Sequence, residues 1–285
     1  MTEHAAQMTS PIGLVAGGGA LPFAVAESLS ARGLTPVLFP VRGFCDPDRV
    51  KAYRHRWIGL GQLARLMKFM RAEGCRDIVF IGSLVRPALT DLRLDFGTLR
   101  MIPAIVRGLR GGDDHLLSAT AKVFENGGFR LCGITDIAPD LLMPEGTLTR
   151  AAPDPAALAD IARGQDLLHA ISAFDIGQAV VVIDNHVVAT EDIGGTDSLL
   201  ARVARLREEG RLRARRGRGV LVKGPKAGQD LRFDLPALGP LTVAGVAEAG
   251  LAGIAIAAGY SVVAEPQAMI EAADRAGVFV TGVSA

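Results

Sequence analysis

A short apolar segment that runs into three consecutive glycines and then into a helical pattern limits the fold of this chain more than any other feature. Residues 12–16 are apolar, Gly17-Gly18-Gly19 follows, and residues 21–29 place apolar side chains at helical spacing. This order predicts a buried strand, a tight turn and a helix, since glycine permits backbone conformations that other residues avoid. A strand, a turn and a helix in this order open a parallel α/β domain.

The same alternation of strands and helices continues through the first half of the chain. Strands are predicted at 36–41, 77–82 and 129–134, and helices at 58–73 and 113–126. Short apolar strands separated by helices are typical of parallel sheets, which are covered on both faces. We therefore predict an N-terminal Rossmann-like, doubly wound α/β domain over residues 11–140.

Prolines and glycines interrupt regular structure between residues 137 and 155, and we place a domain junction there. We predict a linker over 141–149 and a C-terminal α/β domain over 150–285. Its helices are expected at 156–174, 198–209 and 266–276, a hairpin at 180–189 turning at 185–186, and strands at 220–223, 253–257, 261–264 and 278–281. Two domains also suit the 285 residues of the chain, because a single domain usually has ~100–200 residues.

Charge and cysteine content narrow the class of protein. Lys and Arg total 31 against 30 Asp and Glu, so the chain lacks a basic excess and we expect no nucleic-acid partner. The three cysteines are an odd number without the spacing of a metal site, which favours a reducing compartment. The N-terminal residues do not resemble a signal peptide, and the most apolar stretch, 243–259, is shorter than a membrane span. We expect a cytoplasmic protein.

The glycine turn is a candidate phosphate site. Backbone N–H groups at Gly17, Gly18, Gly19 and Ala20, with the start of the next helix, can face an anion because glycine allows close approach. The dinucleotide fingerprint is incomplete, since Pro22 replaces its third glycine and no acidic residue ends the second strand. An ordinary NAD site is therefore disfavoured, and a purely structural turn is the alternative.

Acidic residues at two predicted helix starts can either cap the helix or face a ligand. Asp113 and Asp114 open the helix predicted at 113–126, where one carboxylate can cap the helix and the other can meet a ligand hydroxyl or a metal. The Gly-Thr-Asp motif at 195–197 has a similar form, with Thr196 expected as the cap. The sequence does not decide between the two roles.

The loop after the strand at 220–223 carries the most distinctive polar group of the chain. Residues 223–234 combine two lysines, an arginine and acidic residues with glycines and a proline. Cations such as Lys223 and Lys226 can neutralise phosphate oxygens, and a carboxylate such as Asp230 can hold Mg²⁺, which prefers hard oxygen ligands. A solvated charged loop is the alternative.

Six motifs of this chain together resemble one family. They are LVAGGGALP at 14–22, GDD at 112–114, DIGQ at 175–178, GTD at 195–197, Lys223 with Lys226, and QDLRFDLP at 229–236. In order and spacing they resemble the LpxI-type UDP-2,3-diacylglucosamine pyrophosphatases, and the resemblance covers residues 12–282.

The resemblance implies a cytoplasmic enzyme of lipid A biosynthesis. Such an enzyme uses Mg²⁺ to cleave UDP-2,3-diacylglucosamine into UMP and 2,3-diacylglucosamine 1-phosphate, also called lipid X. The resemblance further implies two domains with the ligand between them and a homodimer, and it is compatible with peripheral contact with the inner membrane.

Roles for individual residues follow from the residues and the resemblance together. Catalysis is assigned to Asp230, Lys223 and Lys226, and Mg²⁺ binding to Asp230 with Asp197. Substrate binding is assigned to Gly17, Gly18, Gly19, Ala20, Asp113, Asp114, Thr196, Gln229 and Arg232. Two rival functions remain, an NADP-dependent oxidoreductase that would hold the 2′-phosphate with Arg42, and a non-catalytic protein that binds nucleotide sugars or lipids.

Overall fold

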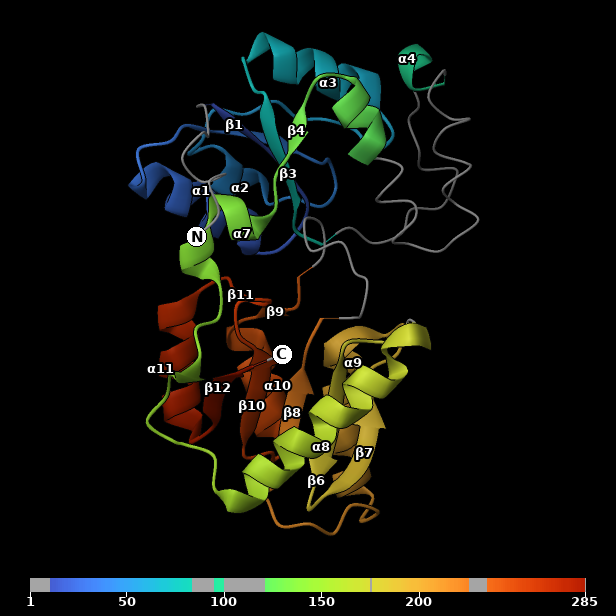
Figure 1. Cartoon of the computed structure of the whole chain (residues 1–285), viewed down its shortest axis with the longest axis vertical. Coiled ribbons are helices and arrows are strands. Elements are labelled where there is room, and N and C mark those ends of the chain that lie inside the picture. The colour runs from blue at the N-terminus through green and yellow to red at the C-terminus, as the bar shows by residue number, and fades with distance from the viewer. Residues whose placement is uncertain (1–10, 84–94, 100–120, 175, 226–234, 285) are drawn as a thin grey trace. The chain divides into compact units, whose positions relative to one another are not determined.

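The structure, a computed structural model, describes residues 11–83, 95–99, 121–174, 176–225 and 235–284 (Figure 1). These residues form two compact α/β units, and the chain passes from the first to the second between Leu141 and Leu142. The predicted two-domain α/β fold is therefore confirmed. In the described ranges, no helix combines the length and the apolar character that crossing a membrane requires.

The first unit is built on a four-stranded parallel sheet. Its strands are β1 (Ile12–Ala16), β2 (Pro36–Pro40), β3 (Asp77–Ile81) and β4 (Arg130–Leu131), in the order β2-β1-β3-β4. The chain goes from β1 to its neighbour on one side and then returns to its neighbour on the other side. The sheet is therefore doubly wound, as predicted, and its switch point lies between the carboxyl ends of β1 and β3.

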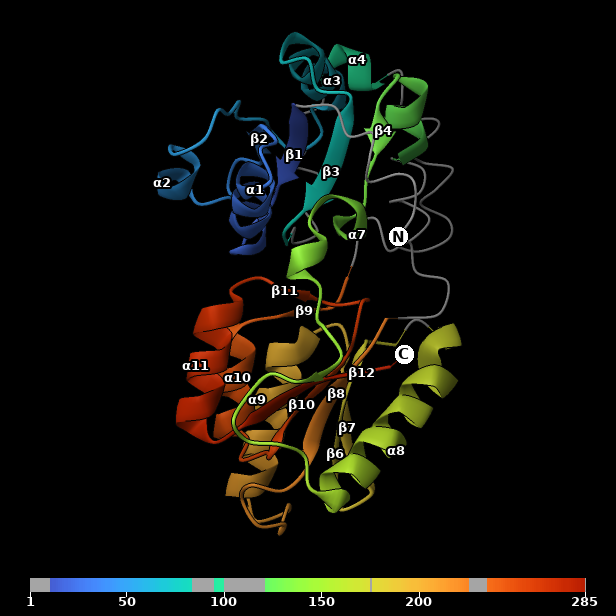
Figure 2. The same cartoon turned by 60° about the vertical axis from the view of Figure 1, so that its left-hand side comes forward.

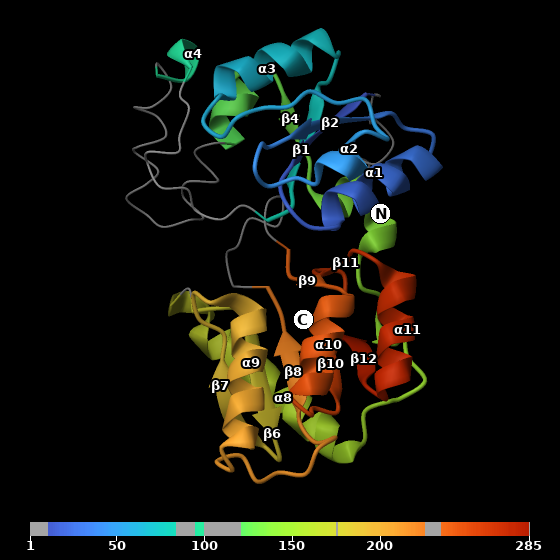
Figure 3. The same ribbon diagram turned by 180° about the vertical axis from the view of Figure 1, so that it is seen from behind.

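Helices cover both faces of this sheet. The helices of this unit are α1 (Leu21–Ala31), α2 (Pro47–Val50), α3 (Leu63–Ala72), α4 (Phe96–Leu99), residues 121–126 and α7 (Ile134–Ile137), followed by the 3₁₀ turn η4 (Pro139–Leu141). Figure 3 shows α3 on one side of the sheet and α1 on the other. The amphipathic α3 buries Leu66, Met67 and Met70 in a cluster with strand residues such as Val37 and Ile78.

The second unit is built on a six-stranded mixed sheet in the order β5-β12-β10-β8-β6-β7. Its strands are β5 (Gly146–Thr147), β6 (Ala179–Ile183), β7 (His186–Thr190), β8 (Val220–Lys223), β10 (Gly253–Ala257) and β12 (Phe279–Val283). The three strands β8, β10 and β12 are parallel, whereas β6 runs antiparallel to β8, and β7 antiparallel to β6. A separate parallel pair joins β9 (Ala237–Leu238) and β11 (Val262–Val263).

The three central strands β6, β8 and β10 are buried along their whole length because both faces of the sheet are covered, and apart from Lys223 at the end of β8 their residues are apolar or glycine. The helices are α8 (Pro155–Ile171), α9 (Gly195–Glu208), α10 (Pro240–Glu248) and α11 (Pro266–Ala276), and the 3₁₀ turn η5 (Ser172–Phe174) follows α8. Figure 2 shows α8 on one side of the sheet and α9, α10 and α11 on the other. Alternate residues of β6 accordingly enter two different cores, with Val180 facing α8 and Val181 facing α9 and α10.

Several predicted boundaries differ from the structure for local reasons. The helix predicted from 58 begins only at Leu63, after Gly59 and Gly61, and the strand predicted at 129–134 contains just β4 before α7 begins. The hairpin turns at Asp184-Asn185, one residue earlier than predicted, since these two residues adopt positive φ angles of 49° and 63°. The segment predicted as a linker, 141–149, contributes β5 to the second sheet and Met143 to its core. Of the helix predicted at 113–126, only 121–126 lies within the described residues.

Candidate functional site

Backbone hydrogen bonds join the glycine turn after β1 to the end of β3. The N–H of Gly17 donates to the carbonyl oxygen of Ile81 at 2.8 Å, and the N–H of Gly18 donates to that of Ser83 at 2.8 Å. The N–H of Ser83 donates back to Gly18 at 3.0 Å. The N–H groups of Gly17 and Gly18, which the sequence predicts as phosphate ligands, therefore already donate to backbone carbonyl oxygens.

The turn needs glycine at its first two positions because of crowding, and at its third because of conformation. A Cβ on Gly17 would lie 2.6 Å from the carbonyl oxygen of Ser83, and one on Gly18 would lie 3.2 Å from that of Phe44. Gly19 has open space around it but a φ of +89°. Among the described residues, the N–H groups of Gly19 and Ala20 donate to no backbone acceptor, and α1 has no side-chain cap. The amides that can meet an anion are thus those of Gly19 and Ala20.

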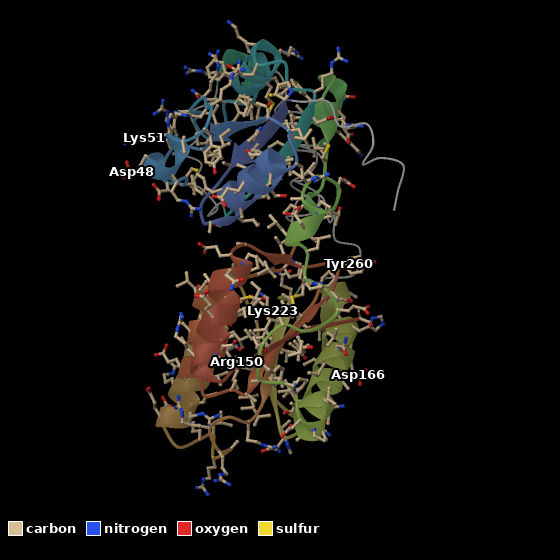
Figure 4. All side chains as sticks on the ribbon, turned by 90° about the vertical axis from the view of Figure 1, so that its left-hand side faces the viewer. Asp48, Lys51, Arg150, Asp166, Lys223 and Tyr260 are labelled. Carbon is tan, nitrogen blue, oxygen red and sulfur yellow. The ribbon has the colours of Figure 1, made fainter. Side chains whose placement is uncertain are left out.

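In the second unit, a buried lysine ends the parallel strand β8. Lys223 is 5% exposed, and its Nζ donates to Thr196 Oγ1 at 3.0 Å and to the carbonyl oxygen of Ala237 at 3.3 Å. A charge this deeply buried is stable only with polar partners around it. Figure 4 labels Lys223 within this unit.

A buried carboxylate holds the partner of this lysine. Glu191, 6% exposed, accepts the hydroxyl proton of Thr196 on Oε1 at 2.6 Å and the N–H of Gln178 on Oε2 at 2.7 Å. Because the Thr196 proton points to Glu191, an oxygen lone pair of Thr196 is available to accept from Lys223. We call Lys223, Thr196, Glu191 and Gln178 the Lys223 cluster.

Strand pairing brings the members of the Lys223 cluster together. Ala179 of β6 pairs with Lys223 of β8, which places Gln178 beside the end of β8, and the N–H of Gly224 donates to the carbonyl oxygen of Gln178 at 3.1 Å. The N–H of Glu191 donates to the carbonyl oxygen of Ala179 at 2.8 Å, so the end of β7 reaches the same edge. Thr196 then follows in the first turn of α9.

The described part of the predicted site differs from expectation in two respects. Thr196 does not cap α9, because its hydroxyl donates to Glu191, and the N-cap position is taken by Gly194 without a side-chain cap. Asp197 is exposed, and within the described residues no three His, Cys, Asp or Glu side chains are grouped to hold a metal ion. The described residues alone therefore do not complete a Mg²⁺ site.

Six predicted site residues lie outside the described residues. They are Asp113, Asp114, Lys226, Gln229, Asp230 and Arg232. Their assigned roles stay predictions, as do those of Gly17, Gly18, Gly19, Ala20, Lys223, Thr196 and Asp197.

Sequence reasoning missed the structural role of Glu191 and Gln178. Glu191 stood out only as an acid near the Gly-Thr-Asp motif, and nothing in the sequence pairs it with Gln178 thirteen residues earlier. The signal that could have found it is an acid directly after the second strand of a hairpin. In a hairpin the second strand ends beside the start of the first strand, so Glu191, after β7, is expected beside Gln178, before β6.

Sequence reasoning also named no residues for apolar ligand contact. Five large apolar side chains at the edge of the second sheet where β8 ends are more than 40% exposed, and we call them the apolar edge: Phe174, Ile176, Ile193, Leu241 and Tyr260. Phe174 and Ile176 precede β6, Ile193 follows β7, Leu241 comes four residues after Ala237, and Tyr260 follows β10. These five side chains are candidates for contact with an apolar ligand, because contiguous exposed apolar surface marks binding sites.

The cysteines do not supply a nucleophile. All three are buried in the first unit, and burial raises the pKa of the Cys75 and Cys132 thiols to about 11 and that of Cys45 in the same direction. Since the thiolate is the reactive form, these side chains are inert at neutral pH.

Comparisons with known proteins agree along the whole chain. Residues 11–141 match the LpxI N-terminal domain, and residues 144–281 match the LpxI C-terminal domain. A Caulobacter vibrioides protein named UDP-2,3-diacylglucosamine pyrophosphatase LpxI is 40% identical over 272 residues, which are 95% of this chain and 97% of that protein. A solved structure of UDP-glucose-4-epimerase from Stenotrophomonas maltophila, with bound NAD and formylated UDP-arabinopyranose, has 12% identity over 73% of this chain and 64% of its own, with a TM-score of 0.28, too low to indicate a shared fold. Both domain matches and the near full-length relative show that this chain belongs to the LpxI family.

Proposed function

We propose that this protein hydrolyses the pyrophosphate bond of UDP-2,3-diacylglucosamine and releases UMP and lipid X in lipid A biosynthesis. The observation that carries the proposal is the near full-length match, at 40% identity, to a relative whose name states this activity. The Lys223 cluster supports the same chemistry, because it holds a cation at the carboxyl end of a parallel strand, where ligands bind in α/β sheets.

The roles of the cations follow from the charge that the reaction develops. Water attacks one phosphorus atom, the bond from that phosphorus to the bridging oxygen breaks, and the leaving phosphate takes up negative charge. Lys223 is proposed to offset this charge, and its hydrogen bonds to Thr196 and the Ala237 carbonyl support the proposal because they fix the ammonium group before the reaction. Lys226 and Arg232 are proposed to neutralise negative charge on the same phosphates. Gln229 is proposed to bind the substrate.

Mg²⁺ dependence is part of the proposal, with Asp230 as the main ligand and Asp197 as the second. When bound, the ion would supply a Lewis acid that offsets the phosphate charge. The exposed carboxylate of Asp197 suits a hydrated Mg²⁺, which usually keeps several waters.

The first unit is proposed to bind the nucleotide. The amides of Gly19 and Ala20 at the start of α1 suit a phosphate, because they lack backbone acceptors among the described residues and lie at the positive end of a helix. Asp113 and Asp114 are proposed to contact the same ligand.

The apolar edge is proposed to contact the acyl chains of the substrate, and the protein to act as a cytoplasmic homodimer with peripheral membrane contact. Replacing Ile193 and Leu241 by Gln should raise KM for the diacyl substrate and leave the melting temperature unchanged, since both side chains are more than 80% exposed. Leu158→Gln is the matched control: it is 53% exposed and lies two residues before Asp160, which accepts from the β6–β7 turn at the opposite sheet edge. An equal rise in KM for the control would contradict the assignment.

Turnover of the intact substrate tests the proposed function. The purified chain is incubated with UDP-2,3-diacylglucosamine and Mg²⁺, and UMP and lipid X are measured, with NADPH binding followed in parallel. We expect the two products in equal amounts and no NADPH binding. Intact substrate after prolonged incubation with folded protein would refute the hydrolase, and NADPH binding would favour the oxidoreductase.

A further inference from the structure

A pocket of about 620 Å³ opens in the first unit beside the end of β2. Six of the residues that line it are Arg42, Cys45, Pro47, Lys51, His55 and Trp57. Its volume falls in the ~300–1,000 Å³ range of small-molecule sites.

The walls of this pocket are fixed by backbone hydrogen bonds. Residues 54–58 run along the outer edge of β2, where the N–H of Leu38 donates to Arg54 at 2.9 Å and the N–H of Arg56 donates to Leu38 at 2.9 Å. At the mouth, the N–H of Arg42 donates to the carbonyl oxygen of Ile58 at 2.9 Å. The pocket therefore keeps its shape without a ligand, which lowers the entropy that binding costs.

The lining combines positive charge with an aromatic surface. Arg42, Lys51 and His55 are basic, and among the described residues no acidic side chain lines the pocket. Lys51 pairs with Asp48 in an exposed bridge at 2.7 Å (Figure 4). The guanidinium of Arg42 lies 5.8 Å from the centroid of the Trp57 ring, and the His55 ring meets Trp57 edge-on at 6.3 Å. Such a lining suits a ligand that is both anionic and aromatic.

The pocket adjoins the glycine turn within the same unit. The N–H of Val41 donates to the carbonyl oxygen of Ala16 at 2.9 Å, and Phe44, between the lining residues Gly43 and Cys45, packs against Gly18. The pocket and the glycine turn thus follow the carboxyl ends of two neighbouring parallel strands, β2 and β1. The carboxyl ends of such strands are where ligands bind in doubly wound sheets.

We propose that this pocket holds the base and ribose of a nucleotide, with the Trp57 ring against the base and Arg42 and Lys51 near the phosphates. The inference rests on the proposed function, because that function supplies a nucleotide as part of the substrate. It names the subsite of the nucleoside, which neither the family match nor the glycine turn gives.

Trp57 is the only tryptophan of the chain, so its emission reports on this pocket alone. The intact protein is titrated with UDP, UMP, uridine, inorganic phosphate and NADPH, and Trp57 emission is followed together with calorimetry. We expect a saturable emission change with UDP and UMP, a weaker affinity for uridine, and no emission change with phosphate. The Arg42→Ala variant should bind UDP about tenfold more weakly, as expected for the loss of one charge-assisted hydrogen bond.

Arg76→Ala is the matched control, because Arg76 is exposed and precedes β3 at the opposite edge of the same sheet. It should bind UDP as the parent does. Calorimetric UDP binding without any change in Trp57 emission would overturn the inference, as would equal weakening by both variants, or an emission change with NADPH but not UDP. Turnover without a change in Trp57 emission would refute the nucleotide subsite and support the hydrolase function. A change in Trp57 emission without turnover would support the subsite and refute the hydrolase function.

Discussion

Two turns of this protein lead from a strand into a helix, and they arrange their polar groups in different ways. The turn after β1 leads into α1 and presents the backbone N–H groups of Gly19 and Ala20. The turn after β7 leads into α9 and builds a chain of buried hydrogen bonds that runs from Glu191 through Thr196 to Lys223. Neither helix has a side-chain cap at its N-terminus.

We propose that this difference separates ligand binding, at the first turn, from chemistry, at the second. Backbone N–H groups carry only partial charges and hold a phosphate through their direction. A buried lysine carries a full charge that water screens little, which is what a developing phosphate charge needs. We therefore expect changes at the first turn to alter ligand binding, and changes in the Lys223 cluster to alter turnover.

The largest expected effect is the loss of activity on metal removal. Excess chelator should abolish turnover, and added Mg²⁺ should restore it, because the phosphate charge then lacks its Lewis acid. The melting temperature should stay constant, since Asp197, the one proposed ligand among the described residues, is exposed, and no three His, Cys, Asp or Glu side chains are grouped there to hold a structural metal ion. Full turnover in chelator would remove the metal from the mechanism, and a large drop in melting temperature would make its role structural.

Glu191→Ala should reduce both turnover and stability, because Glu191 is the positioning residue of the Lys223 cluster. The change leaves the buried N–H of Gln178 without an acceptor and releases the Thr196 hydroxyl, at a cost of about 1–3 kcal/mol of unfolding free energy. We expect a kcat about 10–100-fold lower, by analogy with residues that orient a metal ligand through a hydrogen bond. Urea unfolding and kcat measure the two effects.

Two further variants of this loop sharpen the result. Glu191→Gln keeps one acceptor and should recover part of the kcat. Asp192→Ala removes the neighbouring carboxylate, which is exposed and pairs with Arg202 at 3.0 Å, so kcat should stay near the parental value. Equal kcat values for Glu191→Ala and Asp192→Ala would show that Glu191 does not position the lysine.

Substitutions in the glycine turn should affect stability and ligand binding differently at Gly17 and Gly19. Gly17→Ala forces a Cβ to within 2.6 Å of a backbone oxygen, so we expect a loss of about 3 kcal/mol in unfolding free energy. Gly19→Ala meets no atom but must adopt a positive φ, which costs about 1 kcal/mol. If the Gly19 amide binds phosphate, Gly19→Val should also weaken UDP binding, measured by calorimetry. Unchanged affinity in folded Gly19→Val would leave the turn a structural one.

A separate expected effect, on stability alone, is an alkaline loss of stability confined to the first unit, which holds all three cysteines. Burial raises the pKa of Cys75 and Cys132 from 9.0 to about 11. Above pH 9 the unfolded state loses these protons first, so folding stability falls as pH rises from about 9 to about 11. Urea midpoints followed by Trp57 emission at pH 8 and pH 10.5 measure the loss. The double variant Cys75→Ala with Cys132→Ala should show a smaller drop, and an equal drop would assign it to other groups.

The sequence predicts the fold well where local patterns decide it. Strands such as Ile12–Ala16 and Gly253–Ala257, and the helix Pro266–Ala276, were predicted within one or two residues because apolar runs and glycines bound them directly. Boundaries that depend on neighbours were missed, as at β4, where Ile134 turns into α7 instead of extending the strand. The strand propensity of the local sequence does not predict where tertiary contacts end this strand.

The candidate site was predicted less completely for the same reason. The sequence singled out Lys223 and Thr196 separately, by residue type and adjacent glycines. Their contact, and the link through Glu191 to Gln178, depends on β6 pairing with both β7 and β8. Likewise, the pocket at Trp57 depends on residues 54–58 returning along β2, which no periodic pattern in the sequence indicates.

Lys223→Met tests the central claim most directly, because it removes the charge and keeps much of the side-chain length. We expect kcat to fall about 10²–10³-fold, the usual effect of losing one fixed group that stabilises developing charge. Calorimetric UDP affinity should stay within about threefold of the parent, since the first unit is proposed to bind the nucleotide. Arg163→Ala, an exposed cation on α8, serves as the control with parental kcat. A folded Lys223→Met protein with parental kcat would contradict the account, and lost UDP affinity with kcat retained at saturation would move Lys223 from the chemistry to binding.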